Sequence, residues 1–138
     1  MRLHDVLTIT QDHLFSAEAN LDVEVCSGFG ADLMSDVLRY DVAQGLLLTG
    51  LVNPQIVRTA EMADAVAILM VRGNVPLPET VEVARQVGIP ILGTQYTMFE
   101  TCGRLYAAGL PAAREALATN TPKSRVARPP LVPRTVNS

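Results

Sequence analysis

Three short apolar runs, each followed by a helix-like segment, constrain the fold of this chain more than any other feature. The runs are "GLLLTG" (45–50), "AVAILMV" (65–71) and "IPILGT" (89–94). Uninterrupted apolar runs of this length are typical of strands that are covered on both faces, as in parallel sheets. Three successive strand–helix units therefore predict a parallel sheet with right-handed crossover connections.

Helix signals follow each run. Asn53 is a candidate N-cap with Pro54 at the first helical position, and Thr97 is a candidate cap for the third helix. Pro78 stands at the start of the second helix, which we expect to end at Gly88. These signals support the strand–helix order.

Two further short strands are predicted upstream, in "HLFSAE" (13–18) and "DVEVCSG" (22–28), the latter leading into a helix over "ADLMSDVLRY" (31–40). With the three later units they predict an α/β fold: a three-layer domain with a mostly parallel sheet built from successive strand–helix units. We assign this domain to residues 1–118.

A change in charge and composition marks residues 119–138 as a separate tail. Residues 120–138 hold four basic residues, no acidic residue and four of the nine prolines. The rest of the chain holds seven basic and 14 acidic residues, a net charge of −7. We expect the tail to be disordered or docked on a partner because it has few periodic apolar residues to bury. The acidic body argues against nucleic-acid binding.

The cysteines and the apolar runs suggest a cytoplasmic protein. Cys26 and Cys102 are far apart and have no CxxC partner, which predicts two small buried side chains rather than a disulfide or a zinc site. The longest apolar runs are far shorter than a membrane span, so no membrane association is expected. No cofactor is expected.

The segment "VEVCSGFGADLMSDVLRY" (23–40) has the layout of a phosphate-binding loop without its residues. A dinucleotide fingerprint needs a third glycine where Leu33 stands, and a P-loop needs a lysine, whereas Lys123 is the chain's only one. We therefore expect Gly28 and Gly30 to supply permissive backbone angles for a sharp strand-to-helix turn.

The segment "LDVEVCSGFGADLMSDV" (21–37) resembles the signature of the DRTGG domain family, and the resemblance extends over about residues 3–110. The family pattern is a Leu-Asp pair, a basic residue, Thr-Gly-Gly, an aromatic residue and Asp-Leu-Leu-Ser-Asp-Val. The positions that match are Asp22, Gly28, Phe29, Asp32, Leu33, Ser35, Asp36 and Val37, while Val23, Cys26 and Ser27 replace the motif's Arg, Thr and first Gly.

The resemblance implies a regulatory role. DRTGG domains resemble the N-terminal domain of HPr kinase, accompany CBS domains in some pyrophosphatases, and occur within phosphotransacetylases or beside redox enzymes, usually as dimers. For this chain the resemblance implies a non-catalytic regulatory or accessory module. Such a module would be a homodimer that binds a partner protein, such as a redox or central-metabolism enzyme. The motif and interface residues carried over are Gly28, Asp32, Met34, Ser35 and Asp36.

The residues themselves also predict a dimer contact on the helix after Gly30. The side chains of Leu33, Met34, Val37 and Leu38 recur at three- and four-residue spacings. Such an apolar stripe is wide enough to serve both the core and a partner.

Polar residues that follow the three strands form the candidate ligand site, because ligands of open parallel sheets bind at the carboxyl ends of the strands. These residues are Thr49, Gly50, Asn53, Arg72, Gly73, Thr94 and Thr97. Arg72 directly follows a buried strand and needs a ligand or an acidic partner, which Asp32, Asp36 or Glu100 could supply. An anion or an adenine nucleotide suits this cation and the free N–H groups of helix starts. Helix caps, turns and protein docking are the other interpretations.

An enzyme remains the alternative function, as a small-molecule transferase or a kinase-like enzyme. His4, His13 and Ser35 form no recognisable nucleophile arrangement, and the missing P-loop lysine argues against phosphoryl transfer by that route. Asp32 and Asp36 are four residues apart and could hold a cation, but a solvated acidic helix face is favoured.

Overall fold

A five-stranded sheet in the order β1-β6-β5-β4-β2 forms the centre of the computed structural model. The structure describes residues 1–11, 13–15 and 20–115, so the predicted tail at 119–138 lies outside it. The strands are β1 (His13–Leu14), β2 (Gly28–Gly30), β4 (Leu46–Thr49), β5 (Ala67–Met70) and β6 (Ile91–Gly93). All neighbours pair in parallel except β1, which is antiparallel to β6. The predicted mostly parallel sheet is confirmed.

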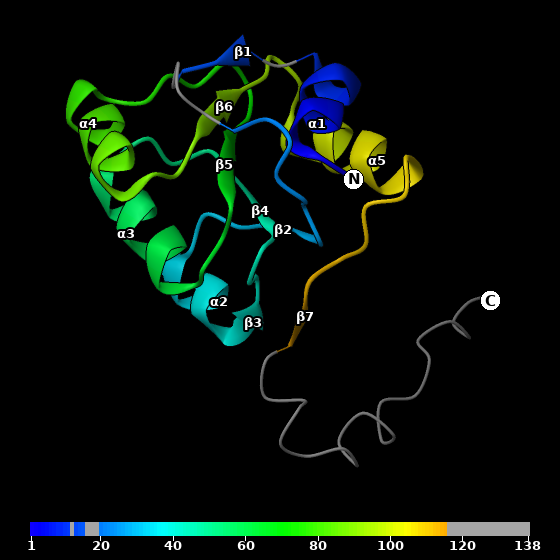
Figure 1. Cartoon of the computed structure of the whole chain (residues 1–138), viewed down its shortest axis with the longest axis horizontal. Helices are drawn as coiled ribbons and strands as arrows, with labels where there is room; N and C mark the ends of the chain where they lie inside the picture. Colours follow the sequence, from blue (N-terminus) through cyan, green and yellow to red (C-terminus); the bar gives the residue numbers. More distant parts are fainter. Residues whose placement is uncertain (12, 16–19, 116–138) are drawn as a thin grey trace.

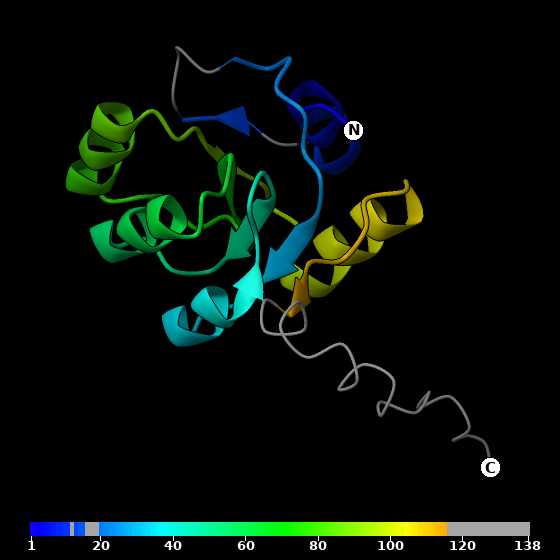
Figure 2. The same cartoon turned by 60° about the horizontal axis from the view of Figure 1, so that its bottom comes forward.

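Helices cover both faces of this sheet, as Figures 1 and 2 show. One face carries α2 (Met34–Arg39), α3 (Pro54–Met62) and α4 (Pro78–Val87), and the other carries α1 (Leu3–Thr10) and α5 (Met98–Ala107). A small second sheet pairs β3 (Tyr40–Asp41) with β7 (Arg114–Glu115). The predicted three-layer α/β domain is therefore confirmed. No helix in the described ranges is both long and apolar enough to cross a bilayer.

The core is split into two clusters because successive strand residues point to opposite faces of the sheet. Leu47 and Ile68 pack with Ile56 of α3 in the cluster on one face. Leu48 and Leu69 belong to the other cluster, together with residues of α1 and α5. All five side chains are almost completely buried. This double coverage explains why the strands read as unbroken apolar runs.

The N-terminal third differs from the expectation in three places. Residues Leu3–Thr10, for which no helix or strand was predicted, form the helix α1, which buries Leu3 and Val6. The strand expected at 22–28 is instead β2 at Gly28–Gly30. Helix α2 begins at Met34 rather than at residue 31. Helix α1 has only eight residues, which is too short for a clear helical pattern in the sequence. Strand β2 is defined by its pairing with β4 rather than by an apolar run.

The turn role expected for Gly28 and Gly30 is wrong. Both lie inside β2, and neither has a positive φ. An added Cβ would lie 3.0 Å from the Leu110 Cδ2 atom at Gly28, and 2.9 Å from the Met98 Sδ atom at Gly30. Glycine suits these two positions because α5 and the segment after it pack closely against this strand and leave little room for a side chain.

The predicted helix starts are confirmed: Asn53 and Thr97 are the N-cap residues of α3 and α5, and Pro54 and Pro78 are the first residues of α3 and α4. The Thr97 hydroxyl accepts a hydrogen bond from the Glu100 N–H at 3.3 Å, which caps α5. Helix α4 ends at Gly88 in the left-handed conformation, with φ 78°. Asn53 occupies the N-cap of α3, but its side chain makes no capping bond. Its Oδ1 atom is buried without a hydrogen-bond partner among the described residues.

Candidate functional site

Residues that follow β2, β4 and β5 meet at the carboxyl edge of the sheet. A Cβ placed on Gly50 would lie 3.1 Å from Arg72 Nη2, 3.4 Å from Asn74 Nδ2 and 3.5 Å from Asp32 Oδ2. The Asn74 amide also donates to the Gly50 carbonyl oxygen at 3.2 Å. The guanidinium, the amide and the carboxylate therefore surround Gly50, and an added Cβ would be tight only against the flexible end of the Arg72 side chain.

Asp32 ties the end of β2 to the end of β4. Its Oδ1 atom accepts hydrogen bonds from the Thr49 hydroxyl at 3.0 Å and from the Gly50 N–H at 2.7 Å. The buried Thr49 hydroxyl in turn accepts from the Leu51 N–H at 3.1 Å. Asp32 therefore precedes α2 and faces the strand ends, whereas Asp36 lies in the first turn of that helix. The acidic helix face expected from this pair is not formed.

Arg72 has an unusual backbone conformation for a residue with a Cβ. Its φ is 61°, in the left-handed region, which costs about 1–2 kcal/mol for an L-residue other than glycine. Its N–H donates to the Tyr96 carbonyl, and the Gly73 N–H donates to the Thr94 carbonyl, both at 2.8 Å. These bonds to the next strand end hold the conformation in place.

The Arg72 side chain is exposed and forms no ion pair within the described residues. Of its three expected partners, Glu100 is instead paired with Arg104 at 2.9 Å. The Asp32 carboxylate lies on the same side of Gly50, but it bonds to β4. The guanidinium charge thus remains available to a ligand.

Arg104 of α5, which is paired with Glu100, lies over the loop that follows β6. The Arg104 guanidinium lies 4.2 Å from the centre of the Tyr96 ring, a cation–π contact. Thr94 is buried, and its hydroxyl donates to the Thr10 carbonyl at 2.9 Å and accepts from the Tyr96 N–H at 3.2 Å. Thr94 therefore holds the loop in shape. Arg104 was not predicted, because nothing in a helical pattern shows which neighbouring loop an arginine will reach.

The motif helix α2 divides its apolar stripe between core and surface. Val37 is completely buried, and Met34 packs partly against the core. Leu33 and Leu38 are 60% and 47% exposed, and Ser35 is exposed as well. The surface available for a partner is therefore narrower than the sequence suggested, and it centres on the two leucines.

The remaining candidate groups are dispersed. His4 lies on α1 with Nδ1 3.3 Å from Asp5, and His13 on β1 contacts the Phe15 ring. Cys26 is exposed, so its expected burial is wrong. Cys102 is partly buried, and this burial raises the pKa of its thiol. Within residues 1–11, 13–15 and 20–115, no three His, Cys, Asp or Glu side chains are grouped as metal ligands.

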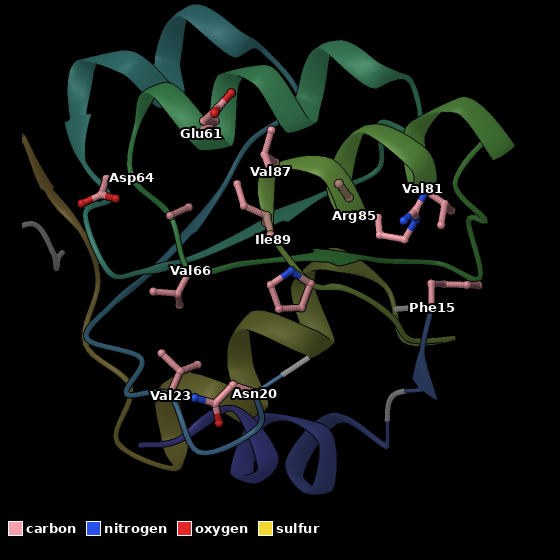
Figure 3. Close-up of a pocket in the computed structure, with 14 residues that line it drawn as sticks. Phe15, Asn20, Val23, Glu61, Asp64, Val66, Val81, Arg85, Val87 and Ile89 are labelled. Atoms are coloured by element: carbon pink, nitrogen blue, oxygen red, sulfur yellow. The ribbon is translucent and has the colours of Figure 1, made fainter. Parts of the chain in front are cut away.

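Two hollows are found in the described structure, and neither is lined by any of the seven predicted ligand residues. A cavity of about 610 Å³ is found at the opposite edge of the sheet, where β5 and β6 begin (Figure 3). A groove of about 350 Å³ runs between β2 and α5, where Phe99 is 88% and Tyr106 71% exposed. Neither hollow was predicted from the sequence. The seven-residue spacing of the two aromatic residues on one helix could have revealed the groove, but the cavity has no local signal.

The fold is similar to that of a solved regulatory protein. A crystal structure of the CBS and DRTGG domains of the regulatory region of Clostridium perfringens pyrophosphatase, complexed with the activator diadenosine tetraphosphate, matches with a TM-score of 0.63. The identity is 12% over 92% of this chain. The DRTGG resemblance is confirmed at the level of the fold. This chain spans 60% of the length of that one. No family model and no curated protein matches its sequence.

Proposed function

We propose that this domain is a non-catalytic regulatory module that binds a small anion at the strand ends, with adenine nucleotides as the first candidates. The observation that carries the proposal is Arg72. Its guanidinium is exposed, has no ion pair among the described residues, and lies on a backbone that glycine would adopt at lower cost. The hydrogen bonds to Tyr96 and Thr94 hold this strained backbone in place, and strained residues that the surrounding structure fixes cluster at ligand sites.

Two further observations support the same function. Tyr96 gives the next loop an aromatic ring, which suits the base of a nucleotide, and the Arg104 guanidinium, which is also paired with Glu100, lies over that ring. The similar regulatory region of the pyrophosphatase is complexed with an adenine-nucleotide activator. Both support a nucleotide-like ligand.

A melting-temperature screen of nucleotides, phosphates and small carboxylates tests the proposal. A ligand at about one hundred times its dissociation constant should stabilise the fold by about 2.7 kcal/mol, a shift of several degrees. Arg72→Ala should abolish this shift, and Arg58→Ala, which removes an exposed arginine of α3, should retain it. Arg72→Gly should melt higher than the wild type without ligand and should not respond to it. A wild type that no compound stabilises, or equal shifts in wild type and Arg72→Ala, would contradict the proposal.

We also propose that the protein is a homodimer whose contact includes Leu33 and Leu38 of the motif segment. Replacing both with Asp should convert a dimer at tens of micromolar into a monomer in sedimentation, because charges in an apolar contact are desolvated without partners. Phe99→Asp, at an exposed position on the opposite layer, is the control and should remain dimeric. A monomeric wild type would refute the homodimer, and a dimer that survives both aspartates would place the contact elsewhere.

A further inference from the structure

The cavity where β5 and β6 begin has an apolar interior. Its lining includes Val66 before β5, Val81 and Val87 of α4, and Ile89 before β6, with Val23 from the segment that precedes β2. Figure 3 shows Val66 and Ile89 near the centre of the opening and Asp64 at its border. Its volume, about 610 Å³, is within the range of ligand and peptide sites. The proposed anion site does not use it.

The border of this cavity favours positive charge. Helices α3 and α4 both end beside it, at Met62 and Val87, and the carboxyl ends of helices carry partial negative charge. Asp64 adds a carboxylate that forms no ion pair within the described part of the chain. Arg85 also lines the cavity, but Glu82 accepts hydrogen bonds from its guanidinium at 2.6 and 2.7 Å. An occupant should therefore combine apolar groups with cations.

The sequence contains a segment of this chemistry. "RVARPPLVPR" (125–134) holds three arginines among valine, leucine and proline side chains, and belongs to a tail without acidic residues. Its prolines have no N–H groups to satisfy, so it can enter an apolar groove as an extended chain. The net charge of −7 in the rest of the chain complements it.

The described chain ends close enough to the cavity for this segment to reach it. Arg114 pairs with Asp41 in the small sheet, and three residues later the Gln44 N–H donates to the Asp64 carbonyl at 2.8 Å. Asp64 lies at the cavity border. The residues between Glu115 and Arg125 span about 30 Å when extended, so the connection imposes no strain.

We propose that residues 125–134 dock into this cavity of their own chain, with arginines toward Asp64 and Glu61 and the valine, leucine and proline side chains on Val66 and Ile89. The tether makes docking intramolecular, at an effective concentration in the millimolar range. A weak contact therefore suffices to keep the cavity occupied, and a competing ligand has to displace the segment.

Methyl NMR and amide exchange of the full chain test the docking. The test variant replaces Arg125, Arg128 and Arg134 with Gln, which leaves residues 1–115 unchanged. Neutralising these arginines should shift the methyl signals of Val66, Val87 and Ile89. In the wild type, amides of 125–134 should exchange about tenfold more slowly than in the variant. High salt should remove this difference, because the contact is partly ionic.

A second pair of variants tests the cavity side. Asp64→Asn should reproduce the effect of the tail variant, because it removes the carboxylate charge that the arginines contact. The backbone should keep its conformation, because asparagine tolerates the positive φ of 60° at this position. Asp36→Asn on α2 should change neither readout. Three outcomes would overturn the proposal: tail amides that exchange at the unfolded-chain rate, methyl shifts that map to the groove near Phe99, and a dimer that dissociates when the tail is neutralised, which would place the segment on a second copy.

Discussion

Replacing Gly45 with alanine is expected to lower the free energy of unfolding by about 1–3 kcal/mol, the range for overpacking a filled core. Gly45 is buried directly before β4, between two backbone carbonyls. An added Cβ would lie 2.7 Å from Ser27 Oγ, 2.9 Å from the Val42 carbonyl oxygen and 3.1 Å from that of Ser27. The serine side chain can rotate away, but the carbonyls cannot. The Val42 carbonyl also accepts the Gly45 N–H at 2.8 Å, so relief of the clash would weaken this bond.

Gly103→Ala is the matched control. Gly103 is exposed in the interior of α5, and an added Cβ meets no described side chain within 4 Å. Alanine in an exposed helix interior is expected to raise the free energy of unfolding by about 0.5–1 kcal/mol. Urea unfolding of both variants gives the comparison. Equal stability of the Gly45 and Gly103 variants would show that the segment before β4 can move, contrary to the packing described.

The glycines and strands show which parts of the fold could be read from the sequence. Strands β4, β5 and β6 were predicted because burial on both faces leaves an unbroken apolar run. Strand β2 is Gly-Phe-Gly, which has no such run, and only its register with Leu46, Leu47 and Leu48 makes it a strand. The close approach of Met98 to Gly30 depends on the placement of α5, which local sequence does not encode.

The candidate site also combines features that the sequence predicts with features that it does not. The nearness of Gly50 to Arg72 followed from topology, because the carboxyl ends of neighbouring parallel strands meet at one edge. The left-handed φ of Arg72 and the bond from Thr49 to Asp32 depend on tertiary hydrogen bonds. The large cavity draws its lining from separate segments between residues 15 and 90, so no single motif could indicate it.

Asp32→Ala is expected to lower the free energy of unfolding by about 1–3 kcal/mol, because it leaves the buried Thr49 hydroxyl without its acceptor. The Gly50 N–H also loses its partner, although water can reach that less buried group. Thr49→Val removes the donor instead, so the double variant should cost less than the sum of the two single ones. Denaturant unfolding of the four proteins measures this coupling. Strict additivity would mean that the bond between Asp32 and Thr49 does not contribute to stability.

Asp32→Asn separates that structural role from the electrostatic one. The amide oxygen can still accept from the Thr49 hydroxyl and the Gly50 N–H, so stability should change far less than in Asp32→Ala. The negative charge beside the Arg72 guanidinium disappears, and with it the repulsion of an anion bound there. At surface dielectric this repulsion corresponds to about a threefold to tenfold difference in affinity. An anion that stabilises the wild type should therefore bind Asp32→Asn more tightly in a calorimetric titration, and the gain should shrink as salt rises. Weaker binding would mean that the carboxylate itself contacts the ligand, and unchanged binding would place the anion away from Arg72.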